Sequence, residues 1–245
     1  KDAPIFFSKA STLSNVSMKS LAVHIGSQLL ELSPYKSAYE KIAEMTRYLR
    51  STGHEISHLD LGGGLGIPYS DESLADLNAY NQIILETVGD LDCKLSIEPG
   101  RYLVGEAGIL ITRVIYIKQG EQKKFVIVDG AMNDLIRPTL YDGFHAIVPV
   151  TEKNLSSQKS LCDVVGPICE SGDYFAKDRM LPEVSQNDLL AITCSGAYGA
   201  VMASNYNSRP LIPEVLVSND VFSVIRERQA FEKIIQDEKL AAWLQ

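Results

Sequence analysis

The first hundred residues alternate between short apolar runs and amphipathic helical segments, and this alternation constrains the fold more than any other feature. Three apolar runs predict strands, at residues 21–25, 56–61 and 94–98. Between them, residues 34–52 and 74–88 carry apolar side chains at helical spacing. Strands that alternate with helices form parallel sheets with crossover helices. Residues 1–108 are therefore predicted to form an α/β domain.

The helix ends carry recognisable signals. Pro34 suits a first helical turn, Ser33 and Ser73 are candidate N-caps, and Gly53 ends the first helix. Another helix is predicted at residues 3–13, with no strand before it. Because three strand–helix units cannot cover both faces of a parallel sheet, we expect a fragment of a larger sheet or barrel whose N-terminal part is missing here.

The second half of the chain, residues 109–245, has the sequence pattern of an all-β domain. Its short apolar runs lie at residues 109–118, 124–129, 145–150, 160–165, 189–193, 214–217 and 221–226. Runs of this length between turn signals predict a β-sandwich or β-barrel. A closing helix is predicted over residues 229–244.

Charge and composition exclude several classes of protein. Lys and Arg number 23 against 31 Asp and Glu, a net charge of −8, which argues against a nucleic-acid groove. No apolar run approaches the roughly 18 residues that span a bilayer, and residues 1–9 do not resemble a signal peptide. The four cysteines form no C-x-x-C pair. We therefore expect reduced thiols in a cytoplasmic protein that binds neither nucleic acid nor membrane.

Glycine-rich or polar sequences follow all three predicted strands. They are His-Ile-Gly-Ser-Gln at 24–28, Leu-Asp-Leu-Gly-Gly-Gly-Leu-Gly at 59–66 and Ile-Glu-Pro-Gly-Arg at 97–101. Successive glycine N–H groups can hold a phosphate, although each sequence alone could be an ordinary turn. Sites in a (β/α) barrel form where the carboxyl ends of the strands meet, so we expect one anion site built from all three.

Residues 54–58 match the H-E-x-x-H pattern of zinc hydrolases. That chemistry requires both histidines on one face of a helix. Here Gly53 ends a helix, and residues 56–61 are predicted to be a strand. We therefore expect no metal site.

Three further polar clusters lie between the predicted strands of the second half. Residues 166–173 contain Cys169 and Glu170, and a cysteine thiol, whose pKa is ordinarily about 8.5, can transfer protons near neutral pH. The alternative is a buried, inert cysteine in a turn. The other clusters are Arg-Pro-Thr-Leu-Tyr at 137–141 and Ser-Gly-Ala-Tyr-Gly at 195–199.

Taken together, these segments resemble the diaminopimelate decarboxylases, a family of fold-type III pyridoxal-phosphate decarboxylases. The match extends from residues 24–28 to 205–210, and Gly-Pro-Ile-Cys-Glu-Ser-Gly-Asp at 166–173 is its most specific part. The resemblance implies that residues 1–108 are the last three βα units of a TIM-type (β/α)8 barrel and that residues 109–245 are a C-terminal β domain. It also implies a carboxy-lyase that converts meso-2,6-diaminopimelate to L-lysine.

The resemblance implies roles for individual residues. Pyridoxal 5'-phosphate (PLP) would be held by His24, Ser27, Gly62, Gly63, Gly64, Glu98, Pro99, Gly100, Arg101 and Tyr198. An amino-acid substrate would be bound by Arg101, Arg137, Tyr141, Glu170 and Tyr198. Cys169 would be the proton donor. Because the family supplies Cys169 and Glu170 from a partner subunit, a homodimer with shared active sites is expected.

Two alternatives remain open. Arginines beside a glutamate suit a substrate with both a distal carboxylate and a distal ammonium, which favours diaminopimelate over ornithine or arginine. A related decarboxylase of another basic amino acid is nevertheless possible. The family's Schiff-base lysine lies in a Tyr-Ala-x-Lys-Ala context that no lysine here has. We therefore expect this chain alone to be inactive, and a truncated, non-catalytic PLP-binding or regulatory homologue is the second alternative.

Overall fold

The computed structural model describes residues 2–155 and 157–244. The chain divides into two compact units, Lys1–Val104 and Gly105–Gln245, each with its own hydrophobic core. No helix in the described part of the chain is long and apolar enough to cross a membrane.

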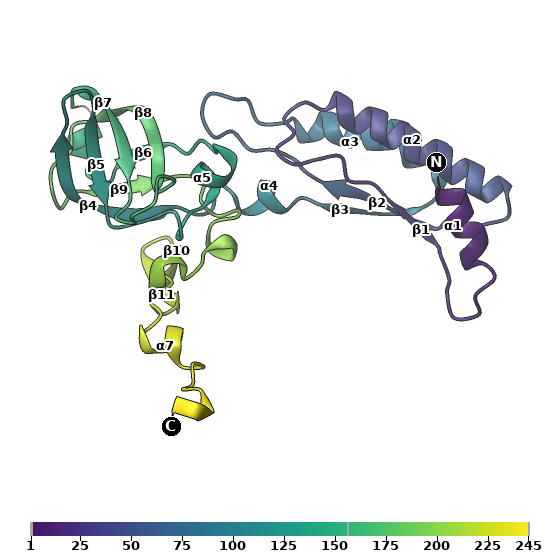
Figure 1. The fold of residues 1–245 in the computed structure, drawn as a ribbon. Coiled ribbons are helices and arrows are strands. Elements are labelled where there is room, and N and C mark those ends of the chain that lie inside the picture. Colours follow the sequence, from purple (N-terminus) through teal and green to yellow (C-terminus); the bar gives the residue numbers. More distant parts are fainter. Residues whose placement is uncertain (1, 156, 245) are drawn as a thin grey trace. The chain divides into compact units, whose positions relative to one another are not determined.

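The first unit contains a three-stranded parallel sheet in the order β1-β2-β3 (Figure 1). Its strands are β1 (Ser20–Ala22), β2 (His58–Gly63) and β3 (Lys94–Glu98). The register aligns Leu21, Leu59 and Leu95 across the sheet, so their side chains point to the same face. The parallel α/β arrangement predicted from the sequence is confirmed.

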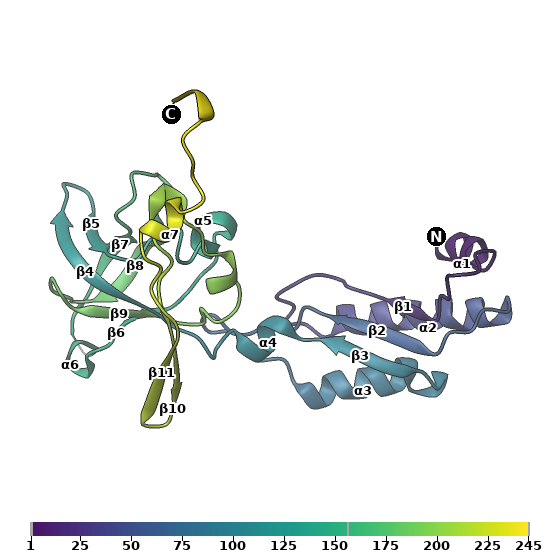
Figure 2. The same cartoon turned by 90° about the horizontal axis from the view of Figure 1, so that it is seen from below.

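Two long helices cover one face of this sheet (Figures 1 and 2). The helices of the unit are α1 (Ala3–Ala10), α2 (Ser33–Ser51), α3 (Leu77–Val88) and α4 (Gly100–Val104), with a 3-10 turn η1 (Gly89–Leu91). The core between α2, α3 and the sheet buries Tyr35, Tyr39, Leu59, Leu61 and Tyr80, among others. The buried apolar residues of α2 and α3 therefore pack on the sheet, which agrees with the crossover helices predicted from the sequence.

Two helix ends differ from the prediction. Helix α1 ends at Ala10 rather than at residue 13, because Ser11 and Thr12 turn their hydroxyls back to carbonyls of the helix. The N-cap predicted at Ser33 is wrong: Ser33 is already helical, and Leu32 is the N-cap without a side-chain hydrogen bond. Pro34 does lie in the first turn of α2.

The N-cap of α3 is also not the predicted one. The helix begins at Leu77, and the Asp76 carboxylate accepts a hydrogen bond from the Asn78 N–H at 2.8 Å. Ser73 lies in the exposed segment before the helix. Both residue types cap helices well, so the choice depends on where the chain enters the helix.

Replacing Asp76 by alanine is expected to lower the free energy of unfolding by about 1 kcal/mol, because an orphan N–H of the first turn loses its acceptor. Ser73→Ala, the matched control, should stay within about 0.5 kcal/mol of the wild type. Urea unfolding of the full natural protein measures both values. Equal losses in the two variants would contradict the assignment of the cap.

Strand β2 begins at His58, two positions later than predicted. The side chain of Arg50 binds the Ile56 carbonyl oxygen, with Nε at 3.0 Å, which removes Ile56 from the ladder. At the other end, Gly62 and Gly63 continue the strand. Residues Gly62, Gly63 and Gly64, called the glycine segment below, therefore begin in the strand and end in the loop that follows it.

The second unit contains a six-stranded mixed sheet in the order β6-β9-β4-β5-β7-β8. Its strands are β4 (Leu110–Gln119), β5 (Lys124–Val128), β6 (Ile147–Pro149), β7 (Lys159–Val165), β8 (Tyr174–Pro182) and β9 (Leu189–Ile192). Among these described strands, β5 and β7 pair in parallel and the other neighbours pair antiparallel. The edge strands β6 and β8 approach each other, so the sheet curls almost into a barrel (Figure 1).

Strand β8 was not predicted. Its sequence is interrupted by the charged residues Lys177, Asp178 and Arg179, and Asp178 adopts a left-handed conformation with φ of 49°. The apolar alternation on which strand prediction depends is therefore broken within the strand.

The second unit also contains short helices, so it is not purely β. They are α5 (Arg137–Tyr141), α6 (Glu152–Leu155) and α7 (Glu232–Ile235), with 3-10 turns η2 (Ala200–Met202), η3 (Tyr206–Ser208) and η4 (Ala242–Leu244). Strands β10 (Glu214–Ser218) and β11 (Val221–Arg226) form a separate antiparallel hairpin.

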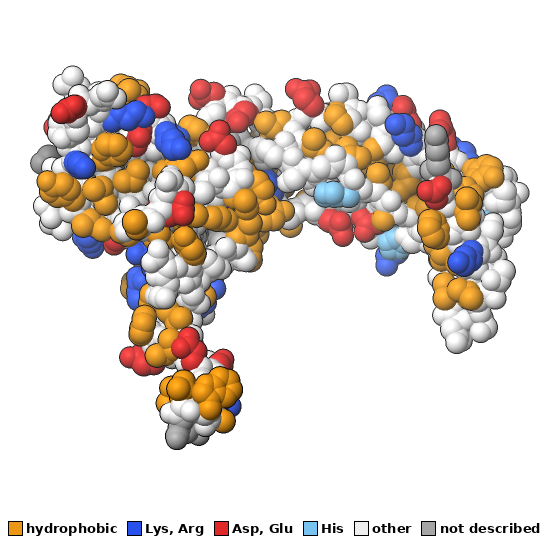
Figure 3. All heavy atoms as spheres, viewed as in Figure 1, with side chains coloured by type: hydrophobic (Ala, Val, Ile, Leu, Met, Phe, Trp, Pro, Cys, Tyr) orange, Lys and Arg blue, Asp and Glu red, His pale blue; other side chains and the backbone are white. Residues whose placement is uncertain are grey.

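The closing helix predicted over residues 229–244 is wrong, since only α7 and η4 form there. Of the apolar side chains on which this prediction depends, Phe231 and Ile235 are 52% and 44% exposed, and Ile234 is half-buried. Short helices depend on packing of an apolar face, and these side chains are not buried. Figure 3 shows hydrophobic side chains at the surface of the C-terminal segment that carries β10, β11 and α7.

Candidate active site

The carboxyl ends of β1, β2 and β3 pack backbone against backbone, with the glycine segment in the middle. A Cβ added at Gly62 would overlap the carbonyl oxygen of Val23, and one added at Gly63 would overlap that of Glu98. Gly62 also has a φ of 69°, which L side chains rarely adopt. The structure therefore brings the three sequences predicted to form one site together, and glycine is required for their approach.

The segment that follows β1 is locked to the residues after the glycines. The Leu29 N–H donates to the Gly64 carbonyl oxygen at 2.9 Å. The Gln28 side chain donates to the Ile67 carbonyl oxygen at 2.6 Å and accepts from the Ile67 N–H at 3.2 Å. These contacts hold Ser27 at a fixed place beside the glycine segment.

Arg101 connects the end of β3 to both other strand ends. Its Nη2 donates to Ser27 Oγ at 3.2 Å, and its Nη1 donates to the Tyr69 hydroxyl. The guanidinium also lies 5.7 Å from the centre of the Tyr69 ring. Ser27 and Arg101 were predicted together, whereas Tyr69 was missed, although it follows the glycine run closely in sequence.

The other predicted cofactor residues of the first unit lie at the same strand ends. His24 follows β1, Glu98 ends β3, and both are exposed. Pro99 precedes the short helix α4, which begins at Gly100, and a Cβ at Gly100 would meet no atom within 4 Å. Gly100 is therefore not required by packing, unlike the glycines of β2.

One N–H of the glycine segment is engaged within the protein. The Gly62 N–H donates to Asp60 Oδ1 at 2.8 Å. This N–H reaches a bound phosphate only if the Asp60 side chain moves away. The role predicted for Gly62 therefore depends on Asp60, which was not singled out in the sequence.

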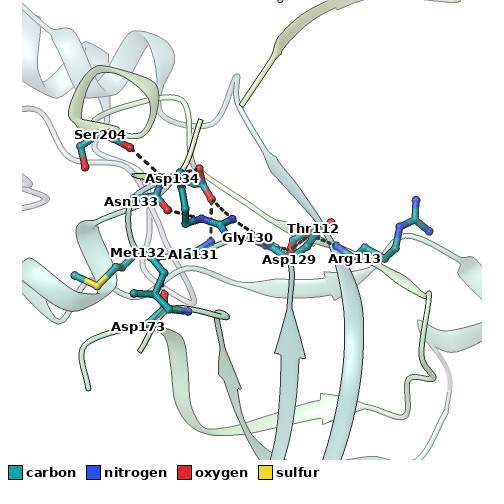
Figure 4. A network of polar contacts seen from close by, with 12 residues as sticks. Thr112, Arg113, Asp129, Gly130, Ala131, Met132, Asn133, Asp134, Asp173 and Ser204 are labelled. Atoms are coloured by element: carbon teal, nitrogen blue, oxygen red, sulfur yellow. Dashed lines mark hydrogen bonds and ion pairs between the residues drawn. The ribbon is translucent and has the colours of Figure 1, made fainter. Parts of the chain in front are cut away.

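In the second unit, the buried carboxylate of Asp173 organises the loop that carries Cys169 and Glu170, and Figure 4 shows Asp173 with its partner Met132. Asp173 is 4% exposed and accepts hydrogen bonds from the Met132 N–H at 2.7 Å and the Ile168 N–H at 2.6 Å. A side chain at Gly166 would overlap this carboxylate. The loop therefore depends on Asp173, which was predicted only as the last residue of a motif.

A second buried carboxylate, that of Asp134, lies in the turn from Asp129 to Asp134 (Figure 4) and joins this turn to Arg209. Asp134 accepts from the Ala131 N–H at 2.9 Å and lies 3.7 Å from Arg209 Nη2. Arg209 Nε also donates to Asn133 Oδ1 at 3.0 Å. Burial raises the pKa of the Asp134 carboxyl, an effect that the Ala131 N–H and Arg209 oppose.

Cys169 and Glu170 themselves are exposed. Glu170 Oε1 accepts from the Gly172 N–H at 3.2 Å, and the Tyr206 hydroxyl donates to Glu170 Oε2 at 3.4 Å. The Cys169 thiol and the Glu170 carboxylate thus lie at neighbouring exposed positions of a loop that Asp173 supports by hydrogen bonds. Such a pair can donate a proton and bind a cation.

Arg137 and Tyr141 lie on the single turn of α5. Arg137 is 7% exposed, and its Nη1 lies 2.7 Å from His145 Nε2. The other ring nitrogen, Nδ1, lies 2.8 Å from the Thr193 carbonyl oxygen, which can only accept. Nδ1 therefore carries the proton and Nε2 accepts from Arg137, so the buried His145 is neutral. No motif in the sequence indicated a role for His145.

Tyr141 and Tyr198 are 62% and 42% exposed, and Tyr198 has a φ of 59°. The Tyr198 side chain is thus partly exposed on the second unit. Its left-handed backbone conformation is costly for a tyrosine and is more common at functional sites than elsewhere.

The two histidines of the H-E-x-x-H match have other contacts. His54 packs edge-on against Phe7, with ring centres 5.5 Å apart. His58 is the first residue of β2, and its Nε2 lies 2.9 Å from Ser96 Oγ. Among the described residues, no three His, Cys, Asp or Glu side chains are grouped so that they could hold a metal ion.

Comparison with protein families decides which class of site this is. Residues 17–196 match the family described as pyridoxal-dependent decarboxylase, C-terminal sheet domain. The chain belongs to the pyridoxal-dependent decarboxylase family. The match extends over both units, from before β1 to the residues just before Tyr198.

Individual members of the pyridoxal-dependent decarboxylase family are similar over nearly the whole chain. A diaminopimelate decarboxylase from Zymomonas mobilis is 44% identical over 246 residues, which cover 100% of this chain and 58% of that protein. The crystal structure of diaminopimelate decarboxylase from Helicobacter pylori complexed with L-lysine superimposes with a TM-score of 0.90 at 44% identity, covering 96% of this chain and 58% of that one.

A more distant similarity is to the lysine decarboxylase from Selenomonas ruminantium, with a TM-score of 0.79 at 25% identity over 90% of this chain and 57% of that one. The chain thus spans somewhat more than half the length of the pyridoxal-dependent decarboxylases it matches.

Proposed function

We propose that the protein is a PLP-dependent carboxy-lyase that converts meso-2,6-diaminopimelate to L-lysine and CO₂. The observation that carries the proposal is the similarity, at more than 40% identity across both units, to diaminopimelate decarboxylases. Similarity to the lysine decarboxylase is much weaker.

The units are proposed to correspond to the parts of such an enzyme. Residues 1–108 would be the last three βα units of a TIM-type (β/α)8 barrel, and residues 109–245 the C-terminal β-sandwich or β-barrel domain. Parallel sheets normally have both faces covered and continue to further strands. Leu95 and Ile97 of the edge strand β3 are 38% and 47% exposed, which supports the presence of further barrel units beside them.

The strand ends of the first unit fit a phosphorylated cofactor. Backbone N–H groups of Gly63, Gly64, Gly100 and Arg101, with the Ser27 hydroxyl, are donors suited to a phosphate. Gly62 would join them if the Asp60 side chain moves. When bound, PLP would supply a ring that takes up the electron pair released as CO₂ leaves.

The remaining cofactor contacts are proposed by position. His24 would stack on the ring, Pro99 would line the cofactor site, and Tyr198 would reach the phosphate. The Glu98 carboxylate would keep the pyridine nitrogen protonated, since a nearby negative charge favours the protonated form. Protonation makes the ring a better acceptor of electrons.

The substrate contacts follow from charge. Arg101, Arg137 and Tyr141 would bind the distal carboxylate, with Tyr198 beside them, and Glu170 would bind the distal ammonium. Cys169 Sγ would deliver the proton to the carbon that loses CO₂.

We further propose that Cys169 and Glu170 act in the site of a partner subunit, in a homodimer. Both residues are exposed on their own unit, which supports this arrangement. The exposed apolar side chains of β10 and β11, such as Phe222 at 75%, are also of the kind that another protein surface covers.

Replacing Glu170 by alanine tests the substrate assignment. In the full natural protein loaded with PLP, kcat/KM for meso-diaminopimelate should fall about 100-fold, because the distal ammonium loses its charged partner. The matched control Glu183→Ala, at the end of β8, should leave kcat/KM within about twofold. Unchanged turnover in Glu170→Ala, or a wild type that prefers L-ornithine or L-arginine, would contradict the proposal in favour of a related decarboxylase.

A further inference from the structure

Three tyrosines form a buried cluster directly beneath the glycine segment. Tyr35 and Tyr39 come from α2 and Tyr80 from α3, and their exposed fractions are 0%, 0% and 5%. The ring centres are 5.3 Å apart for Tyr35 and Tyr80, 5.9 Å for Tyr35 and Tyr39, and 6.2 Å for Tyr39 and Tyr80. Three hydroxyls therefore lie in an apolar core, where each needs a hydrogen-bond partner.

Two of these hydroxyls reach the backbone of the glycine segment. Tyr35 donates to the Gly63 carbonyl oxygen and Tyr39 to the Leu61 carbonyl oxygen, each at 3.3 Å. A Cβ on Gly64 would lie 3.4 Å from the Tyr35 hydroxyl, so this oxygen lies under the Gly63–Gly64 peptide.

The third tyrosine completes the network. The hydroxyls of Tyr39 and Tyr80 are 2.7 Å apart. A hydroxyl has one proton, and that of Tyr39 goes to the Leu61 carbonyl, so Tyr80 donates to Tyr39. The chain of donors runs from Tyr80 through Tyr39 to the strand, and both protons have an acceptor.

The protonation of the cluster does not change near neutral pH. Burial, with the neighbouring Tyr80, raises the pKa of Tyr35 to about 12. Burial and the Tyr80 hydrogen bond raise the pKa of Tyr39, and burial raises that of Tyr80. All three side chains therefore remain hydrogen-bond donors at any pH at which the protein would work.

A carbonyl held in place fixes the next N–H. In a planar trans peptide the C=O of one residue and the N–H of the following residue point in opposite directions. Tyr39 holds the Leu61 carbonyl toward the helices, and the following Gly62 N–H points the other way, to Asp60. By the same geometry, the bond from Tyr35 to the Gly63 carbonyl directs the Gly64 N–H away from the helix layer.

We propose that the Tyr35 hydroxyl, supported by the Tyr39–Tyr80 pair, is a positioning group that aims the Gly64 N–H at the phosphate of the cofactor. The inference rests on the proposed function, because it assigns the phosphate to this segment. None of the three tyrosines touches the cofactor itself. They hold the Gly64 N–H in its binding orientation before the cofactor binds. Without these hydrogen bonds, the glycine segment would lose conformational freedom when the cofactor binds.

The test compares PLP with pyridoxal, which lacks the phosphate. Dissociation constants for both are measured by absorbance titration of the full natural protein. The variants are Tyr35→Phe, which removes one hydroxyl and keeps the ring, and Tyr48→Phe, a control on the same helix whose side chain is 51% exposed. Thermal melting of each cofactor-free variant is measured separately.

Tyr35→Phe should weaken PLP binding about fivefold, as expected for one lost hydrogen bond, and leave pyridoxal binding unchanged. Tyr48→Phe should change neither. If Tyr35→Phe prefers PLP over pyridoxal as strongly as the wild type does, the positioning role is overturned and the proposed function remains intact. A merely structural role would weaken both ligands equally, which also overturns it.

Two further outcomes are decisive. If the wild type binds PLP no more tightly than pyridoxal, the phosphate site of the proposed function fails, and the inference fails with it. If Tyr35→Phe does not fold, Tyr80→Phe decides, since it removes only the donor to Tyr39. Its preference for PLP should fall about twofold, and an unchanged preference overturns the inference.

Discussion

Replacing Gly63 by alanine is expected to lower the free energy of unfolding by about 3 kcal/mol and to abolish PLP binding. The added Cβ would overlap the Glu98 carbonyl oxygen, so β2 and β3 must separate at the point where the proposed site is formed. The backbone of Gly63 does not have a positive φ, so steric overlap alone accounts for the loss. Chemical unfolding and PLP titration of the full natural protein measure both effects.

The matched control for this substitution is Gly89→Ala. Gly89 follows α3 with a φ of −63°, and the nearest atom to an added Cβ is in Leu85 at 3.8 Å. Alanine at this position should be neutral or slightly stabilising. A Gly63→Ala protein as stable as the control would show that the strands are not in the close contact described here.

Replacing Asp173 by alanine is expected to cost about 3 kcal/mol of stability and most of the proposed decarboxylase activity. Two N–H groups, those of Met132 and Ile168, lose a charged acceptor in a buried place. The loop that carries Cys169 and Glu170 then loses its support, so kcat should fall even where the protein remains folded. Unfolding curves and steady-state kinetics separate the two effects.

Asp90→Ala is the matched control, because its side chain is 68% exposed and pairs with Arg47 at the surface. Exposed ion pairs contribute little, so a change below about 1 kcal/mol and unchanged kinetics are expected. Asp173→Ala with wild-type kcat would contradict the claim that Asp173 positions the loop.

Sequence patterns predicted the first unit well because its elements are strongly periodic. Helix α2 repeats apolar residues toward the sheet, and β3 spans the predicted residues. Helix α3 was placed with the wrong cap, because Ser73 and Asp76 are chemically equivalent signals and only the path of the chain selects Asp76. In the second unit, β8 was missed because charged residues interrupt its apolar pattern. The closing helix was predicted from an apolar spacing that includes Phe231 and Ile235, whose side chains the fold leaves exposed.

The meeting of the strand ends could be predicted, since the carboxyl ends of parallel strands lie at one edge. The buried side chains that support the site residues by hydrogen bonds could not be predicted. Tyr35 reaches Gly63 from 28 positions away, Asp173 reaches Met132 from 41, and His145 reaches Thr193 from 48. Such contacts form only in the packed fold. A tyrosine or histidine within a periodic apolar pattern indicates a core residue and gives no sign of its hydrogen-bond partner.

The most direct test of the proposed function is the reaction itself. The full natural protein, incubated with meso-2,6-diaminopimelate, is assayed for CO₂ and for L-lysine with and without PLP. We expect equal amounts of the two products, formed only when PLP is bound. A folded, PLP-loaded protein that releases no CO₂ from meso-diaminopimelate, or releases it faster from L-lysine or L-ornithine, would contradict the account.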